Sequence, residues 1–191
     1  MPVRSVIAEH LRVIELLVHQ ADEIERIGRD LAERVKRGGR VFWMGNGGSA
    51  AQSMHFAAEL VGRFKRERQA LASLAFSADP SVVTAIGNDY GFEQIFARQV
   101  RAWCRTGDVL IGLSTSGRSP NVIAAFEEAS SRNVYTLGLT GRSGGEMADA
   151  VDACLMIPSD DTARIQEAHL LVGHMWCDWI EQGALDAGPA S

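Results

Sequence analysis

Apolar positions recur along this chain with helical spacing in some segments and in short unbroken runs in others. Residues 5–37 carry apolar side chains at three- and four-residue steps, which predicts one long helix with a single apolar stripe. That stripe consists of Ile7, Leu11, Ile14, Leu17, Ala21, Ile24, Leu31 and Val35. Gly38 and Gly39 follow the stripe and predict the end of the helix.

Short apolar runs alternate with helical segments over the rest of the chain. The runs that predict strands lie at 40–44, 71–76, 108–114, 134–140 and 153–158. The segments that predict helices lie at 49–62, 91–105, 119–132 and 162–182. Strands that are apolar throughout are typical of a parallel sheet covered on both faces. We therefore expect an α/β fold with helices on either side of a mainly parallel sheet.

The chain of 191 residues is long enough for one domain with a sizeable core, and no linker or repeat divides it. A minimal doubly wound unit has no place for the long first helix. We therefore expect residues 1–38 to pack on another subunit or on the flank of the sheet, as a helical oligomerisation segment. The tail, residues 183–191, is expected to be frayed.

Charge and composition exclude several classes of protein. The net charge is −5, so a nucleic-acid footprint is not expected. No stretch approaches the roughly 20 apolar residues of a membrane span, and the N-terminus lacks the apolar run of a signal peptide, so a cytoplasmic location is expected. The cysteines are odd in number and far apart, which indicates structural thiols and no disulfide framework; they are Cys104, Cys154 and Cys177.

Two loops rich in glycine and hydroxyl groups follow predicted strands and precede predicted helices. "GNGGS" follows the first strand, and "STSGRS", with Ser114, Thr115, Ser116 and Ser119, follows the third. In an open parallel sheet such loops lie where ligands bind, and a helix N-terminus with nearby hydroxyls is suited to a phosphate. The alternative is a pair of helix caps, with Ser119 capping the helix that Pro120 begins. Neither loop is a P-loop or a G-x-G-x-x-G motif, so ATP and NAD are poor candidates.

Two helices carry side chains that suit a divalent metal. His55 and Glu59 are four residues apart on one helical face, a pair that also arises by chance on surface helices. Gln166 and His174 are eight apart on the last helix, about 12 Å along its axis and about 80° apart in rotation, so they could just share one ion. Imidazole and carboxylate suit zinc, whereas glutamine is an unusual ligand. His169 points elsewhere and is interpreted as a structural or interface histidine.

The segment "TAIGNDYGFE", residues 84–93, is the third feature with possible chemistry. Asn88, Asp89 and Gly91 predict a turn. Alternatively, Asp89 could bind sugar hydroxyls or orient a catalytic group.

Taken together, these stretches resemble the phosphoheptose isomerases of the sugar isomerase (SIS) family. The matching motifs run in order over most of the chain, from about residue 41 to 182: "GNGGSAA", "HFAAEL", "TAIGNDYGFE", "FARQV", "GDVLIGLSTSGRSPN", "LTGRSGGEMA" and "RIQEAHLLVGH". The resemblance implies one SIS domain over residues 1–191. Its fold would be a flavodoxin- or Rossmann-like three-layer α/β/α sandwich, and the protein a homotetramer with active sites at subunit contacts.

The resemblance also implies the site residues. The phosphate would bind to Ser114, Thr115, Ser116 and Ser119 of "STSGRS", which we name the hydroxyl loop. Further substrate contacts would come from Asn46, Gly47, Ser49, Asn88, Asp89 and Gln166. One zinc ion per subunit would be held by His55, Glu59, Gln166 and His174, with acid–base roles for Glu59 and His174. A residue that ligates zinc tightly is a poor base, and looser ligation when substrate binds is one resolution.

The implied reaction converts sedoheptulose 7-phosphate to D-glycero-D-manno-heptose 7-phosphate through an enediol, the first step of nucleotide-activated heptose biosynthesis for glycans such as lipopolysaccharide. One rival is a non-catalytic sugar-phosphate-binding regulator of the same family, of the type that associates with a replication initiator, for which Glu59 and His174 would be unnecessary. Another is an isomerase for a different phosphosugar. Gln52 and Ala163 stand where relatives often carry aspartate, which bears on fine substrate preference.

Overall fold

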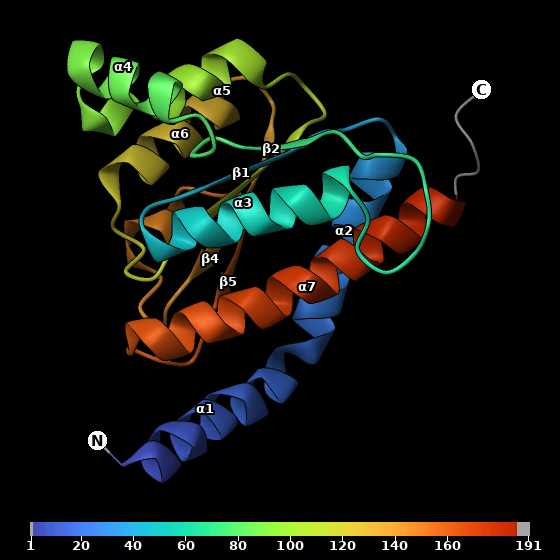
Figure 1. Ribbon diagram of the computed structural model, residues 1–191, viewed down its shortest axis with the longest axis vertical. Coiled ribbons are helices and arrows are strands. Elements are labelled where there is room, and N and C mark those ends of the chain that lie inside the picture. The colour runs from blue at the N-terminus through green and yellow to red at the C-terminus, as the bar shows by residue number, and fades with distance from the viewer. Residues whose placement is uncertain (1, 187–191) are drawn as a thin grey trace.

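Five parallel strands form the central sheet of this computed structural model, which describes residues 2–186 (Figure 1). The strands are β1 (Val41–Gly45), β2 (Ser73–Ala75), β3 (Val109–Ser114), β4 (Tyr135–Thr140) and β5 (Ala153–Met156). They lie in the order β2-β1-β3-β4-β5, which is the flavodoxin-like order. Every neighbouring pair is parallel, so the expected α/β class with a parallel sheet is confirmed.

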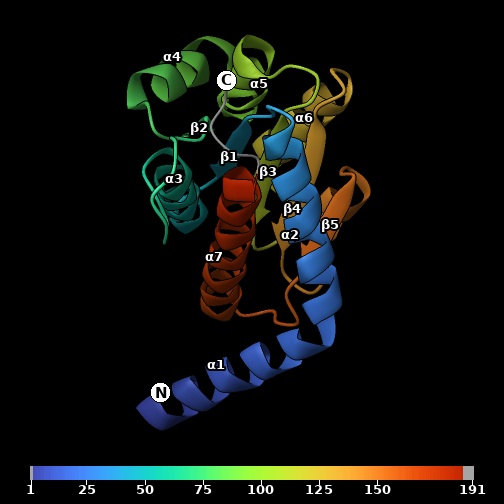
Figure 2. The same ribbon diagram turned by 90° about the vertical axis from the view of Figure 1, so that its right-hand side faces the viewer.

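Alternate side chains of each strand enter two separate cores, one on each face of the sheet. In β1, Val41 and Trp43 join one buried cluster, and Phe42 and Met44 join the other. The first face is covered by α2 (Ala21–Lys36), α3 (Gly48–Val61) and α7 (Thr162–Asp186), and the second by α4 (Pro80–Tyr90), α5 (Ala97–Trp103) and α6 (Pro120–Ser130) (Figures 1 and 2). The three-layer α/β/α arrangement is therefore confirmed.

The long N-terminal helix is present but bent. It divides into α1 (Val3–Leu17) and α2, joined by the 3₁₀ turn η1 (Val18–Gln20). The apolar stripe splits accordingly: Ile24 and Leu31 are buried on the sheet side, whereas Ile7 and Leu11 are more than half exposed. The bend lets α2 follow the body while α1 leaves it as an arm (Figure 2). Two polar contacts join α1 to α7: His10 Nδ1 lies 2.7 Å from Glu167 Oε2, and Arg164 Nη1 donates to the Val6 carbonyl at 3.1 Å.

The turn expected at Asn88, Asp89 and Gly91 is wrong for its first two residues, because Asn88 and Asp89 belong to the last turn of α4, which continues to Tyr90. The helix has a strong start: the Asp79 carboxylate accepts hydrogen bonds from the backbone amides of Ser81 and Val82, and Pro80 occupies the first helical position. This capping pattern outweighs the turn propensity of the asparagine, aspartate and glycine that follow.

Two other helix boundaries differ from expectation. The helix expected over 91–105 is divided into a 3₁₀ turn, η2 (Phe92–Gln94), and the shorter α5. The last helix continues to Asp186, four residues beyond 182, so the first part of the tail expected to be frayed is helical. The remainder of that tail, 187–191, lies outside the described residues. A further 3₁₀ turn, η3 (Gly145–Asp149), precedes β5.

The helices α3 and α7 run parallel and in register on the same face of the sheet (Figure 1). Near the start of α3, the side-chain amide of Gln52 donates to the carbonyl of Gln166, 2.6 Å away. Further along, the Phe56 ring lies where a side chain on Gly173 would be, so a Cβ there would overlap it. Because Gly173 has no side chain, the two helices approach closely at this point.

Among residues 2–186, no helix combines the length and apolar character that a membrane crossing would require. All three cysteines are free thiols; Cys104 and Cys177 are buried and Cys154 is partly buried. The buried pair fits the interpretation of cysteines as structural residues.

His169 lies fully buried between α7 and the sheet. Its Nε2 is 3.3 Å from the carbonyl oxygen of Thr140, and its Nδ1 has no partner within the described residues. Burial lowers the pKa of His169 to about 4, so the imidazole is neutral near pH 7. This environment supports its interpretation as a structural histidine.

Replacing Gly173 tests the close approach of α3 and α7. We expect Gly173→Ala to lower the free energy of unfolding by about 1–3 kcal/mol, because the new methyl group overpacks against Phe56. Gly87→Ala is the matched control: a Cβ at Gly87 meets its nearest neighbour at 3.8 Å, so this variant should be neutral or slightly more stable. Equal stability of the two variants in chemical denaturation would contradict the packing described.

The buried histidine predicts a pH dependence of stability. The pKa of His169 in the folded protein, about 4, is below the unfolded value of about 6.5, so protonation favours the unfolded chain. Burial of the neutral imidazole therefore costs no free energy of unfolding above pH 6.5. As the pH falls towards 4, the free energy of unfolding decreases by about 3 kcal/mol. His169→Gln should show a correspondingly smaller fall in unfolding free energy between pH 7.5 and pH 4. The same fall in both proteins would show that His169 is not the titrating group.

Candidate active site

Two loops meet at the carboxyl ends of the neighbouring strands β1 and β3. The chain leaves these strands in opposite directions along the sheet, since β2 lies beyond β1 and β4 beyond β3. Such a switch point is where open parallel α/β sheets bind ligands. The loops "GNGGS" and "STSGRS" are therefore neighbours in space, as expected from their positions after strands.

A reciprocal pair of amides joins the two loops. Asn46 Nδ2 donates to Asn121 Oδ1, and Asn121 Nδ2 donates to Asn46 Oδ1, both at 2.9 Å. Asn121 is almost fully buried in the first turn of α6. It was missed from sequence because a helical asparagine after a proline carries no distinctive signal. Its position directly after the hydroxyl-rich motif is the one available clue.

The hydroxyl groups of the second loop range from buried, at Ser114, to exposed, at Ser116. Ser114 Oγ and Ser119 Oγ lie 2.9 Å apart, and Ser119 makes no capping hydrogen bond to α6. Ser116 is exposed, and its Oγ accepts a hydrogen bond from the backbone amide of Arg118. Ser119 is therefore the N-cap residue that precedes Pro120, as the alternative expected, but its side chain does not cap the helix. Its hydroxyl pairs with that of Ser114 instead.

A third loop supports the hydroxyl loop from behind. Gly117 has a φ of 64°, which a residue with a side chain adopts rarely, and a Cβ there would also overlap Gly144. The backbone amide of Met147 donates to the Gly117 carbonyl at 3.0 Å, and that of Gly141 donates to Thr115 at 3.2 Å. The loop after β4 thus fixes the backbone on which the serines stand.

In the first loop, Gly47 and Ser49 differ in accessibility. Gly47 is exposed, with a φ of 55°, and precedes the first residue of α3. Ser49 is buried, and its backbone amide donates to the Asn46 carbonyl at 3.0 Å. Gly47 therefore faces the side from which a ligand would approach, while Ser49 lies beneath it.

The parallel pair α3 and α7 brings three metal-type donors together. His55 Nε2 lies 2.8 Å from His174 Nε2 and 3.3 Å from Glu59 Oε1, and donor atoms of all three residues lie within 4.8 Å of one another. Burial lowers the pKa of His174, and the adjacent His55 lowers it further. The neutral imidazole that results is the form that accepts a proton or a metal.

The chemistry of this donor set fits a divalent ion. Two nitrogens and one carboxylate oxygen converging on a common point are the ligands of many three-residue zinc sites. With Zn–N distances of about 2.0–2.1 Å, tetrahedral ligands stand about 3.3 Å apart, so the two imidazoles would need to separate by about half an ångström. His55 is exposed and could move by that amount.

Gln166, expected as a fourth ligand, lies at the other end of the helix pair. Its side-chain amide sits against Gly48, seven residues before His55 on α3. Gln52, one of the two departures from the family pattern, donates to the backbone of Gln166 and so fixes this end of α7. Gln166 thus lies against the "GNGGS" loop and apart from the donor cluster.

Asn88 and Asp89 are not joined to either part of the site within the single chain. They are exposed in the last turn of α4, and Asn88 Nδ2 donates to Asp89 Oδ1 at 2.8 Å. Because α4 covers the face of the sheet opposite α3 and α7, these side chains lie apart from the donor cluster.

An aromatic ring adjoins the donor cluster that sequence reasoning did not select. Phe64 stacks on the His174 imidazole, with ring centroids 5.4 Å apart and planes inclined by 16°. It comes from the segment that follows α3, residues 62–70, which has no regular structure. A single phenylalanine in a charged segment gives no signal of such a contact.

Comparisons with known proteins identify the family. The chain matches the family model described as SIS domain over residues 7–141. A phosphoheptose isomerase of Campylobacter jejuni subsp. jejuni serotype O:6 is 51% identical over 175 residues, 92% of this chain and 94% of the relative.

Two solved structures extend the likeness to three dimensions. The phosphoheptose isomerase GmhA from Neisseria gonorrhoeae has a TM-score of 0.87 and 42% identity, over 94% of this chain and 97% of that one. A phosphoheptose isomerase from Francisella tularensis has a TM-score of 0.86 and 36% identity, over 95% and 100%. With matches of this identity over almost the whole length, the chain belongs to the SIS-domain family and, within it, to the phosphoheptose isomerases.

Proposed function

We propose that this chain is an aldose–ketose isomerase that converts sedoheptulose 7-phosphate to D-glycero-D-manno-heptose 7-phosphate, in the biosynthesis of activated heptose. The observation that carries the proposal is the convergence of Glu59 and two imidazoles beside a loop suited to phosphate. The family membership supports the same reaction. A cytoplasmic location and the glycan that receives the heptose stay predictions.

The reaction moves one proton between adjacent carbons of the sugar. A base removes the proton from C1 of the ketose, and the C2 carbonyl oxygen gains a proton, which gives the enediol. Return of a proton to C2 and loss of the O1 proton give the aldehyde at C1. Glu59 is the proposed base and His174 the proposed partner that serves the oxygens, and each such group typically contributes 10²–10⁴-fold.

Zinc is the proposed cofactor, one ion per subunit, held by His55, Glu59 and His174 with Gln166 as fourth ligand. When bound, a divalent ion would polarise the sugar's carbonyl and stabilise negative charge on its oxygens. The three converging donors support this choice, and Gln166 would have to extend along α3 towards them.

The two oxygens of Glu59 suggest how one residue could both hold a metal and act as a base. Oε1 faces His55 at 3.3 Å, while Oε2 forms no hydrogen bond within residues 2–186. Oε1 would stay in the donor cluster, and Oε2 would take the proton. This division removes the need for Glu59 to leave the cluster during turnover.

The phosphate would bind to the hydroxyl loop, with Ser114, Thr115, Ser116 and Ser119 as donors. The start of α6 adds the positive end of the helix dipole, and the backbone amide of Asn121 follows Pro120, which has no N–H. Asn46, Gly47 and Ser49 would line the adjoining side, and the Asn46–Asn121 pair would hold the two loops together.

A homotetramer with active sites at subunit contacts is also proposed. The arm α1 exposes Val3, Ile7 and Leu11 on one face, and none of the residues of α4 is buried within the single chain. The apolar face of α1 is a surface that a second copy would cover, whereas α4 exposes mostly polar side chains and Tyr90. Packing of α4 on another subunit would give Asn88 and Asp89 a route to a neighbour's substrate.

Glu59→Gln tests the proposed base. We expect turnover of sedoheptulose 7-phosphate, followed by NMR, to fall by about 10²–10⁴-fold because the amide cannot accept the proton. Binding of the phosphosugar should persist. Glu33→Gln, at an exposed carboxylate on α2, is the control and should match the wild type. Wild-type turnover in Glu59→Gln would remove Glu59 from the mechanism.

Ser116→Ala tests the phosphate site. A hydrogen bond to a charged group contributes about 1.5–3 kcal/mol, so we expect phosphosugar affinity, measured by calorimetry, to fall by about tenfold or more. Ser131→Ala, an exposed serine at the far end of α6, should bind normally. Unchanged affinity in Ser116→Ala would mean that the hydroxyl loop does not hold the phosphate. Tight binding by the wild type without conversion of any phosphosugar would favour the regulator instead.

A further inference from the structure

Glu181 is a fully buried carboxylate near the end of α7 that the proposed reaction does not use. Its oxygens accept hydrogen bonds from the backbone amides of Phe64, Lys65 and Arg66, each at 2.9 Å. Burial alone raises the pKa of Glu181, but these three amides outweigh it and lower the pKa overall. The charged carboxylate therefore holds the backbone of this segment against α7.

Arg68 connects the same carboxylate to the end of α3. Its side chain is almost completely buried, and its Nε lies 3.4 Å from Glu181 Oε1. Its two terminal nitrogens donate to the carbonyl oxygens of Glu59 and Gly62, at 2.8 and 2.9 Å. Arg68 thus satisfies carbonyls that the end of a helix leaves unpaired, one of which belongs to the proposed base.

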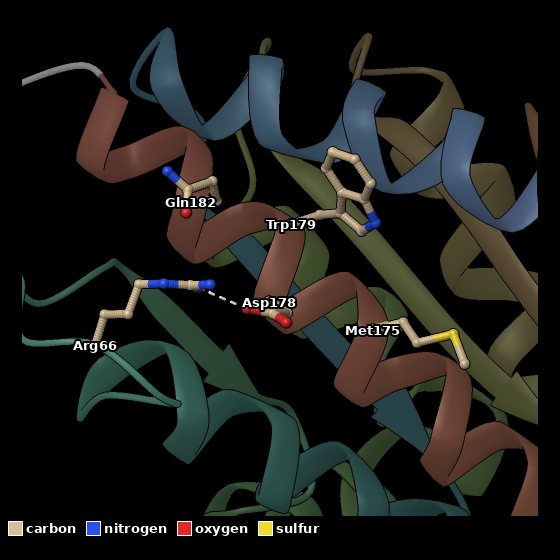
Figure 3. A pocket seen from close by; sticks show the side chains of 5 residues that line it. All are labelled: Arg66, Met175, Asp178, Trp179 and Gln182. Carbon is tan, nitrogen blue, oxygen red and sulfur yellow. Dashed lines mark hydrogen bonds and ion pairs between the residues drawn. The ribbon is translucent and has the colours of Figure 1, made fainter.

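A second contact fixes the outer side of this segment. Arg66 Nη1 donates to Asp178 Oδ1 at 2.6 Å, and Lys65 Nζ donates to Asp178 Oδ2 at 2.7 Å. Figure 3 shows Arg66 reaching across to Asp178 on α7. These pairs are partly exposed and contribute less than the buried Glu181.

The segment fixed in this way carries Phe64, whose ring lies flat on the His174 imidazole. We name residues Phe64, Arg68 and Glu181 the brace. Glu181 orders the backbone of Phe64, Phe64 contacts His174 on α7, and Arg68 contacts the backbone of Glu59 on α3. The brace therefore touches both helices that supply the donor cluster.

We propose that the brace is a positioning device, in which Glu181 acts through Phe64 and Arg68 to hold His174 and Glu59 in the geometry that binds metal and transfers the proton. This inference rests on the proposed function for its catalytic part only. The hydroxyl loop lies after β3, beyond the start of α3, so the brace should affect metal binding and the chemical step without affecting phosphate binding.

Glu181→Gln and Phe64→Leu test the brace. Glu181→Gln replaces one of the two acceptor oxygens by an NH₂ donor and removes the negative charge, so the three backbone amides can no longer all be satisfied. Phe64→Leu removes the stacked ring while keeping apolar volume. We expect zinc affinity, measured by chelator competition without substrate, to fall by about tenfold, as for other residues that support metal ligands. The kcat for sedoheptulose 7-phosphate should fall similarly, with KM within about twofold.

Two further variants serve as matched controls. Glu67→Gln makes the same charge change in the same segment at an exposed side chain, and it should bind zinc as the wild type does. Phe64→Tyr keeps the ring that stacks on His174, so it should restore zinc affinity and kcat relative to Phe64→Leu.

The outcomes separate the brace from the proposed function. Wild-type zinc affinity and kcat in both Glu181→Gln and Phe64→Leu would overturn the brace, as would an equal rise in KM and fall in kcat. Absence of zinc binding by the wild type would also overturn it. If the wild type binds zinc but isomerises no phosphosugar, the proposed function fails, and the zinc affinities alone decide on the brace.

Discussion

The close parallel packing of α3 on α7 is the constraint on which the site depends. Phe56 occupies the space that the missing side chain of Gly173 leaves, so the two helices can approach. Equal rise along both helices then keeps successive positions opposite one another: Gly48 faces Gln166, and His55 faces His174. The metal-type donors therefore converge because two helices share a register, although they are more than a hundred residues apart in the chain.

The other half of the site has a different origin. The order of strands places a switch point between β1 and β3, and the loops that leave these strands meet there. The helix α3 links the two halves, because it begins at the first loop and carries His55 seven residues, about 10 Å, further along its axis. This distance suits a substrate that carries its phosphate at one end and its carbonyl at the other.

Local patterns predicted the fold and part of the site. The strand runs are apolar because both faces of the sheet are covered, and this made the fold class readable. The pairing of His55 with Glu59 could also be predicted, because the two residues share a helical face. The approach of His174 depends on tertiary packing and was inferred from a family resemblance. The contact of Phe64 with His174 and the exchange of hydrogen bonds between Asn46 and Asn121 join distant segments, and no local pattern encodes them. The helix α4 was not predicted, and its end was taken for a turn, because its start at Asp79 and Pro80 was not weighed against Asn88 and Asp89.

If the register of α3 and α7 creates a metal-binding centre, zinc will bind where His55, Glu59 and His174 converge. The most direct test is anomalous diffraction at the zinc absorption edge from crystals of the zinc-loaded wild-type protein. We expect one strong peak per subunit within bonding distance of His55, Glu59 and His174. A strong peak elsewhere, or none at these side chains while zinc is bound in solution, would contradict it.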